Sequence, residues 1–178
     1  LLLVVGYKNI LFIKSKLTKE LLIGTKSSKK NKAKLNTQMY ILAGNQSKLN
    51  DILSITINSD LKTIAVLNRN KNAQLEILIF PTYRSGNFSP MKIISLKNIA
   101  DDAVDILFHA SNDEIFILNS LSKEIVLVSS LSDIRHHDKS HHPMILRKMI
   151  LKENLFISPI SVSLKENSLM IGDKSSNM

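Results

Sequence analysis

The sequence predicts an all-β fold, and three observations support this. Apolar and polar residues alternate with a period of two in several segments, which is typical of strands with one buried face. Short polar turns join these segments in pairs, as in β-hairpins. The pairs recur about every 51 to 54 residues. Recurrence at a period of this size indicates a repeat architecture, and four-stranded units of this length are typical of β-propellers.

The hairpins are the clearest part of the repeat. Their first strands are predicted from the alternations at Leu53-Ile55-Ile57, Val104-Ile106-Phe108 and Ile160-Val162-Leu164. Their second strands are predicted at residues 63–68, 114–119 and 168–173, and residues 9–14 fit the same shape. The second strands therefore end at positions 14, 68, 119 and 173, which sets the register of the units.

Two further apolar runs complete each unit. Third strands are expected at residues 20–23, 75–80 and 124–128, and fourth strands at 38–42, 90–96 and 143–150. Residues 145–152 could also form a helical turn, but their place in the repeat favours a strand. The prediction is a single incomplete domain of about three and a half four-stranded antiparallel blades, with units at about 1–50, 51–102, 103–157 and 158–178.

A ring needs more blades than this, because an open arc would expose two large apolar sheet faces to water. We therefore expect the sequence to be a fragment and the missing blades to belong to the same parent chain. The register also predicts the core: side chains buried between sheets should include Ile55, Val66, Ile106, Ile117 and Val162.

Composition narrows the function classes. Hydrophobic residues make up 44% and charged residues 22%, as in ordinary globular proteins. The absence of cysteine excludes disulfides and cysteine metal sites. The longest apolar run, residues 1–5, is far too short to span a membrane. The net charge of +9 would suit an anionic partner, but it follows from a general excess of lysine.

The C-terminal segment, residues 158–177, resembles an NHL-type propeller repeat: a proline, an apolar alternation, a turn, an apolar strand and then Asp173. The resemblance is looser at residues 52–70 and 103–122, where Asn68 and Asn119 replace the aspartate. YWTD-like, YVTN-like and divergent WD40-like blades stay open as alternatives. The resemblance implies a propeller that presents a binding surface.

Asn68, Asn119 and Asp173 recur at one position of the repeat. Lactonase-like propellers hold a divalent cation with Asn, Asp and Glu side chains, so these three residues are candidate metal ligands by that resemblance. Asn and Asp at strand ends also cap turns. The turn role is the favoured interpretation, partly because Lys14 occupies the first copy.

Three loops carry residues of other chemistry. Four histidines and an aspartate lie between Arg135 and His142, a set that could bind zinc or copper, although a solvated loop is the favoured interpretation. The basic stretch from Lys26 to Lys34 could contact phosphates, but it contains no aromatic residue to stack on a base. Asn45 begins a glycosylation sequon.

The usual catalytic signatures, such as a phosphate loop or a nucleophile elbow, do not occur in the sequence. The sequence therefore favours a non-enzymatic interaction or scaffold propeller that binds a protein partner, with no catalytic, cofactor-binding or metal-binding residue assigned and no cofactor expected. The alternatives are a metal-dependent, lactonase-like hydrolase and an RNA-binding NHL propeller.

Overall fold

The computed structural model describes residues 2–7, 10–16, 37–42, 46–82, 89–109, 113–129, 145–165 and 168–174. These ranges contain thirteen β-strands and no helix, which confirms the all-β prediction. Within them, no segment forms a helix with the length and apolar character needed to cross a bilayer.

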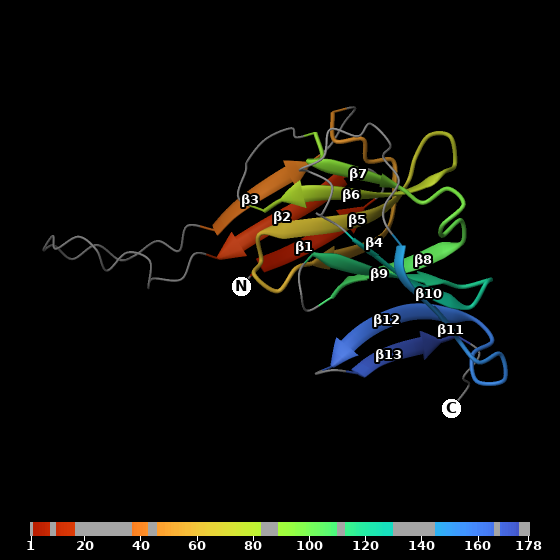
Figure 1. Cartoon of the computed structure of the whole chain (residues 1–178). Helices are drawn as coiled ribbons and strands as arrows, with labels where there is room; N and C mark the ends of the chain where they lie inside the picture. The colour runs from red at the N-terminus through yellow and green to blue at the C-terminus, as the bar shows by residue number, and fades with distance from the viewer. Residues whose placement is uncertain are drawn as a thin grey trace, which may run out of the picture.

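The strands form four antiparallel sheets that follow one another along the chain (Figure 1). The first sheet contains β1 (Leu2–Tyr7), β2 (Ile10–Lys16) and β3 (Thr37–Leu42). The second contains β4 (Asp51–Ile57), β5 (Thr63–Arg69), β6 (Leu75–Pro81) and β7 (Lys92–Ser95). The third contains β8 (Ala103–Phe108), β9 (Glu114–Asn119), β10 (Glu124–Ser129) and β11 (Ile145–Ile150). The fourth contains β12 (Pro159–Lys165) and β13 (Ser168–Asp173).

The second and third sheets have the strand order that the repeat predicts, each strand pairing with the next along the chain. Residues 145–150 form strand β11, as their place in the repeat indicated. The first sheet differs. The segment expected as its fourth strand, β3, pairs directly with β2, where β6 and β10 lie in the other sheets. The prediction that this segment is the fourth strand of its sheet was therefore wrong, because alternation identifies a strand but not the strand it pairs with. Residues 20–23, which were expected to form the third strand, lie outside the described ranges.

Each hairpin of the second, third and fourth sheets carries a β-bulge near the start of its first strand. The register shifts lie between Ile52 and Ser54 in β4, between Ala103 and Asp105 in β8, and between Pro159 and Ser161 in β12. A bulge increases local twist and re-aims the side chains that follow it. The residues just after the bulges, Ser54, Asp105 and Ser161, therefore occupy equivalent places.

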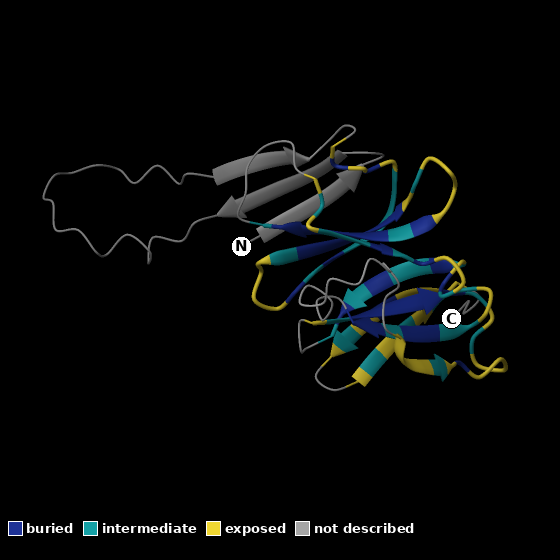
Figure 2. Cartoon of the chain, turned by 45° about the horizontal axis from the view of Figure 1, so that its top comes forward, coloured by how far each residue is buried: buried dark blue, intermediate teal, exposed yellow. Residues whose placement is uncertain are grey.

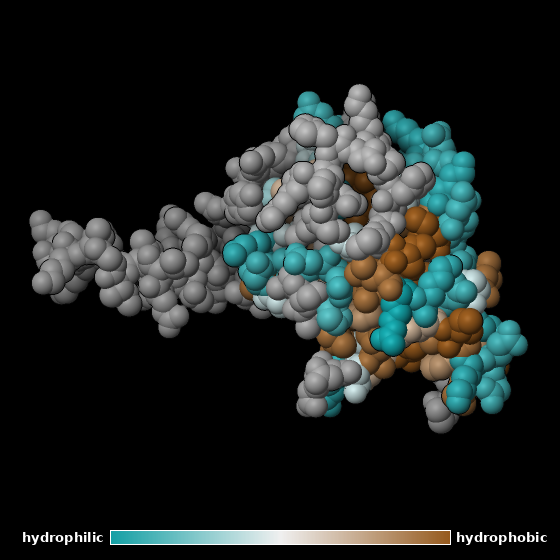
Figure 3. Space-filling model, in the orientation of Figure 1, coloured by the Kyte–Doolittle hydropathy of each residue, from teal (hydrophilic) through white to brown (hydrophobic). Residues whose placement is uncertain are grey.

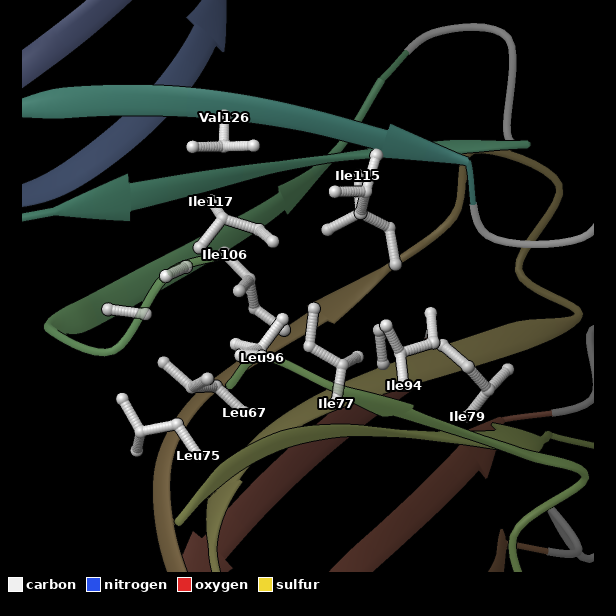
Figure 4. Close-up of a cluster of buried hydrophobic side chains, with 14 of the residues drawn as sticks. Leu67, Leu75, Ile77, Ile79, Ile94, Leu96, Ile106, Ile115, Ile117 and Val126 are labelled. Atoms are coloured by element: carbon white, nitrogen blue, oxygen red, sulfur yellow. The ribbon is translucent and has the colours of Figure 1, made fainter. Parts of the chain in front are cut away.

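The sheets pack face to face, and the alternation along each second strand decides which neighbour a side chain meets. In β5, Ala65 and Leu67 point toward the third sheet, whereas Ile64 and Val66 belong to a cluster on the other face. Figure 4 shows the first of these layers, with side chains of the second and third sheets facing one another. Burial of apolar area between the sheets is the main source of stability.

Four of the five predicted core residues are buried: Val66, Ile106, Ile117 and Val162. Ile55 is half-buried instead. Figure 2 shows the general pattern, with buried residues along the strands and exposed residues at the turns that join them. Ile55 packs against the cluster on the face of the second sheet that points away from the third sheet, whereas Ile106, at the equivalent position of β8, lies in the layer between the second and third sheets. The prediction for Ile55 was therefore wrong.

The first strands of the sheets lie next to one another in chain order. β1 lies against β4, β4 against β8, and β8 against β12. Because each of these strands is at the edge of its sheet, some backbone N–H groups have no partner strand on that side. The contacts between the first strands therefore decide how these N–H groups are satisfied.

Candidate functional site

The described residues bring polar groups together along the line where the first strands meet, which we call the seam. The seam consists of Ser54 and Thr56 on β4 and Asp105 on β8. The backbone N–H of Ile106 donates to Ser54 Oγ at 3.4 Å, and the N–H of Phe108 donates to Thr56 Oγ1 at 3.2 Å. Two hydroxyls two residues apart thus accept from two amides two residues apart.

Asp105 continues this pattern from the third sheet to the fourth. Its carboxylate oxygen Oδ2 accepts a hydrogen bond of 2.8 Å from the N–H of Val162 on β12. Its other oxygen, Oδ1, accepts from the Ser54 hydroxyl at 2.5 Å and from the N–H of Ile106 at 2.9 Å. One carboxylate therefore joins three consecutive sheets, through charge-assisted bonds that are stronger than neutral ones.

The seam is a set of acceptors for backbone amides. Ile106, Phe108 and Val162 are all buried, so their outward N–H groups would lose their bonds to water without replacement if no acceptor faced them. The side chains of the preceding first strand supply acceptors, and the N–H of Ile106 also donates to Asp105 of its own strand. This arrangement is suited to joining sheets, because every polar group in it is already engaged with backbone or a neighbouring side chain.

Asn68, one of the three recurring candidates, is fully buried and has hydrogen bonds on both ends of its amide. Its Oδ1 accepts from the N–H groups of Asn50 and Asp51, at 2.9 and 3.2 Å. Its Nδ2 donates to Glu76 Oε1 at 2.8 Å and to the carbonyl oxygen of Lys48 at 3.3 Å. Asn68 therefore fixes the chain where it enters β4, which is the turn-capping role that the sequence favoured.

Asp173 has the same role in the fourth sheet. Its carboxylate accepts from the N–H of Ile157 at 2.7 Å and from the N–H of Ser158 at 3.1 and 3.2 Å, just before β12 begins. Asn119 differs from both, since its buried Oδ1 has no hydrogen-bond partner among the described residues. In that sheet, the segment before β8 is joined to the turn after β9 by Asp102, which accepts hydrogen bonds from the N–H groups of Leu121 and Ser122.

Asn68 and Asp173 thus both hold the segment that leads into the first strand of their own sheet. In the described part of the chain, no group of three or more His, Cys, Asp or Glu side chains is arranged to hold a metal ion. The histidine-rich segment from Arg135 to His142 and the lysine-rich segment from Lys26 to Lys34 lie outside the described residues, as does Asn45 of the sequon. Ser47 of the sequon is buried.

Asp105 is the residue that sequence reasoning missed. The alternation Val104, Ile106, Phe108 placed it between apolar residues on the other face of the strand, where a carboxylate reads as solvent-exposed. The signal that could have found it is the repeat itself: Ser54 and Asp105 both lie fourteen positions before the strand ends at Asn68 and Asn119. A polar residue recurring on a strand otherwise rich in apolar residues indicates a shared structural contact.

A second feature is an exposed apolar surface at the outer edge of the third sheet. The four residues Ile145, Leu146, Arg147 and Lys148 of β11 are exposed, and Ile150 has 79% of its surface accessible. Beyond β11, Leu155 and Ile157 are 65% and 68% exposed. In the second sheet, Glu76 pairs with Ser95, and in the third sheet the equivalent Glu124 pairs with Ile150. Ile150 therefore lies at the position that a serine occupies in the second sheet.

Comparisons with known proteins leave the family open: no protein-family model matches the chain, and no curated protein matches it.

Proposed function

We propose that the chain is part of a β-propeller that acts as a non-enzymatic interaction module, binding a protein partner through the apolar surface of β11 and the segment that follows it. The exposed Ile150 is the observation that carries this proposal.

The stacking of the sheets supports the propeller. Consecutive antiparallel sheets share apolar layers, and their first strands lie against one another in chain order from β1 to β12. In a propeller the first strand of each blade lies nearest the central channel, and neighbouring blades pack face to face. The repeat of about fifty residues and the recurring bulges fit the same arrangement.

The surface of β11 supports protein binding. β7, the fourth strand of the second sheet, has Ser95 where β11 has Ile150, so a polar outer position is compatible with this fold. An isoleucine that is 79% exposed gives up roughly 1.5 to 3 kcal/mol of hydrophobic stabilisation that a covering partner would supply. Figure 3 shows hydrophobic residues at the surface of the described part of the chain, in an area that includes the third and fourth sheets. Exposed apolar side chains that gather on a surface are common at interaction sites.

Basic residues within the same strand define the partner further. Lys148 shares its face of β11 with Ile150 and forms an ion pair of 3.5 Å with Glu124, whereas Arg147 points to the other face. An exposed apolar surface with basic residues favours a partner that presents apolar side chains and acidic groups. Among the described strands, β11 pairs with β10 alone, so its other edge offers backbone groups to a partner strand.

The test uses the Ile150→Ser variant, which installs the residue of the second sheet. A protein captured by the immobilised chain is identified, purified and titrated against both forms by calorimetry. We expect at least a tenfold loss of affinity in the variant and an unchanged melting temperature. Leu61→Ser is the matched control, because Leu61 is 52% exposed and lies on the β4–β5 turn of the second sheet rather than on the third sheet. Equal affinities of the wild type and Ile150→Ser for every captured protein would contradict the proposal.

A further inference from the structure

The outer face of the fourth sheet repeats the acceptor pattern of the seam. Ser161 follows the bulge of β12 as Ser54 follows the bulge of β4, and Ser163 lies two residues on, as Thr56 does. Both serine side chains are exposed. Within the described part of the chain, neither hydroxyl has a hydrogen bond to another residue, whereas Ser54 and Thr56 each accept one from β8.

The direction of these side chains follows from the alternation. Val162 lies between the two serines and is buried against the third sheet, in the cluster that contains Phe116 and Leu118. Neighbouring residues of a strand point to opposite faces, so Ser161 and Ser163 point away from the third sheet. Met170 on β13 lies directly opposite Ser163 and is 48% exposed.

The place beside Ser161 is kept open by a glycine. A Cβ atom added to Gly172 would lie 2.3 Å from Ser161 Oγ, closer than non-bonded atoms can approach. The corresponding residues in β5 and β9 are Leu67 and Leu118. Gly172 therefore lets the Ser161 hydroxyl lie across the hairpin at a position where the other two sheets carry a leucine.

We infer that Ser161 and Ser163 form a docking site for the first strand of a further four-stranded sheet of this repeat. That strand would present two outward N–H groups two residues apart, with apolar side chains at the same two positions, as β8 presents Ile106 and Phe108 to Ser54 and Thr56. The inference rests on the proposed propeller arrangement and deepens it, because it fixes which atoms join the fourth sheet to the next one.

The contact between the second and third sheets and the contact between the third and fourth sheets indicate which strand would dock here. In both, the side chain after the bulge accepts from the amide of the next first strand: Ser54 from Ile106, and Asp105 from Val162. Two residues further along, β4 has Thr56, which accepts from the N–H of Phe108, whereas β8 has Leu107, which has no side-chain acceptor. The second bond therefore forms between the second and third sheets but not between the third and fourth. Ser163 provides a hydroxyl at this second position. The fourth sheet can therefore accept hydrogen bonds from both N–H groups of a strand like β8.

The experiment adds such a strand from the chain itself. Because Asn68 and Asp173 end equivalent strands, a copy of residues 69–119 joined directly after Asp173 continues the repeat in phase and brings a second copy of β8. Amide hydrogen exchange is then measured by NMR at Ile106 and Phe108 in both copies. We expect the added pair to be protected like the native pair.

The double change Ser161→Ala and Ser163→Ala decides the inference. Loss of the Ser163 hydroxyl should speed exchange of the added Phe108 amide about tenfold, and the added Ile106 amide should change less, because in the native copy this amide also donates to Oδ1 of its own Asp105 at 2.9 Å. The native amides of Ile106 and Phe108 should be unaffected, and Ser168→Ala, on β13 rather than β12, should change neither pair. If the added amides are protected and their exchange rates are the same in the double variant, the docking site is wrong, although the proposed propeller is not contradicted.

Two other results separate the docking site from the propeller. Added amides without protection, in a protein whose native amides keep theirs, would count against both the docking site and the proposed propeller. Sedimentation of the parent chain tests a second copy as the occupant. A dimer that the double change dissociates would overturn the assignment to a further sheet, whereas a monomer with unchanged melting temperature in the parent double variant is the expected result.

Discussion

The Asp105 carboxylate offers the sharpest test of how the sheets are held together, and Asp105→Ala is the perturbation. The change removes the acceptor of the Val162 N–H, which belongs to a residue with 7% exposure. An amide left without a partner in such a place costs about 1 to 3 kcal/mol. The Ser54 hydroxyl also loses its acceptor, at a cost of about 1 kcal/mol, while the Ile106 N–H keeps its bond to Ser54.

Together these losses predict a fall of about 2 to 4 kcal/mol in the free energy of unfolding, a large share of the 5 to 15 kcal/mol typical of a domain. The assay is urea unfolding followed by circular dichroism, with linear extrapolation to water. Asp105→Asn should cost less, because one carbonyl oxygen remains as an acceptor. Asp113→Ala, an exposed aspartate just before β9, is the matched control and should stay within about 0.5 kcal/mol.

A double-mutant cycle with Ser54→Ala then isolates the pair. If the carboxylate joins the second and third sheets, the two changes should couple by about 1 kcal/mol or more. A loss below about 0.5 kcal/mol for Asp105→Ala, or additive effects of the two changes, would refute the reasoning that this side chain links three sheets.

Two further predictions concern the cap and the core. Asn68→Ala should lower the free energy of unfolding by about 2 to 4 kcal/mol, because it leaves the amides of Asn50 and Asp51 without their acceptor; Asn119→Ala, whose Oδ1 has no partner among the described residues, should cost less. Equal losses in thermal unfolding would show that the capping bonds of Asn68 contribute little. Ile117→Ala should cost about 3 to 4 kcal/mol because this side chain is fully buried between two sheets, whereas Ile55→Ala should cost about half as much. Similar urea midpoints for these two variants would contradict the register of the core.

Much of the local structure could be predicted from the sequence, because alternation and turns act over a few residues. The hairpin of β4 and β5 follows from residues 53–57, the polar turn after them and the apolar run at 63–68. The repeat then placed β6, β7, β10 and β11 in their sheets. The turn role of Asn68 was also accessible, since amide side chains at strand ends cap backbone groups.

The tertiary structure alone decided what the first strands do. Period two predicts that Ile55 and Ile106 both face a neighbouring sheet, but it does not show which neighbour each side chain meets, and Ile55 is half-buried where Ile106 is buried. It also gave no partner for β3, which pairs with β2. Strand pairing and seam contacts join residues far apart in the chain, as Ser54 joins Asp105, and no local pattern records which distant residue will supply the missing acceptor.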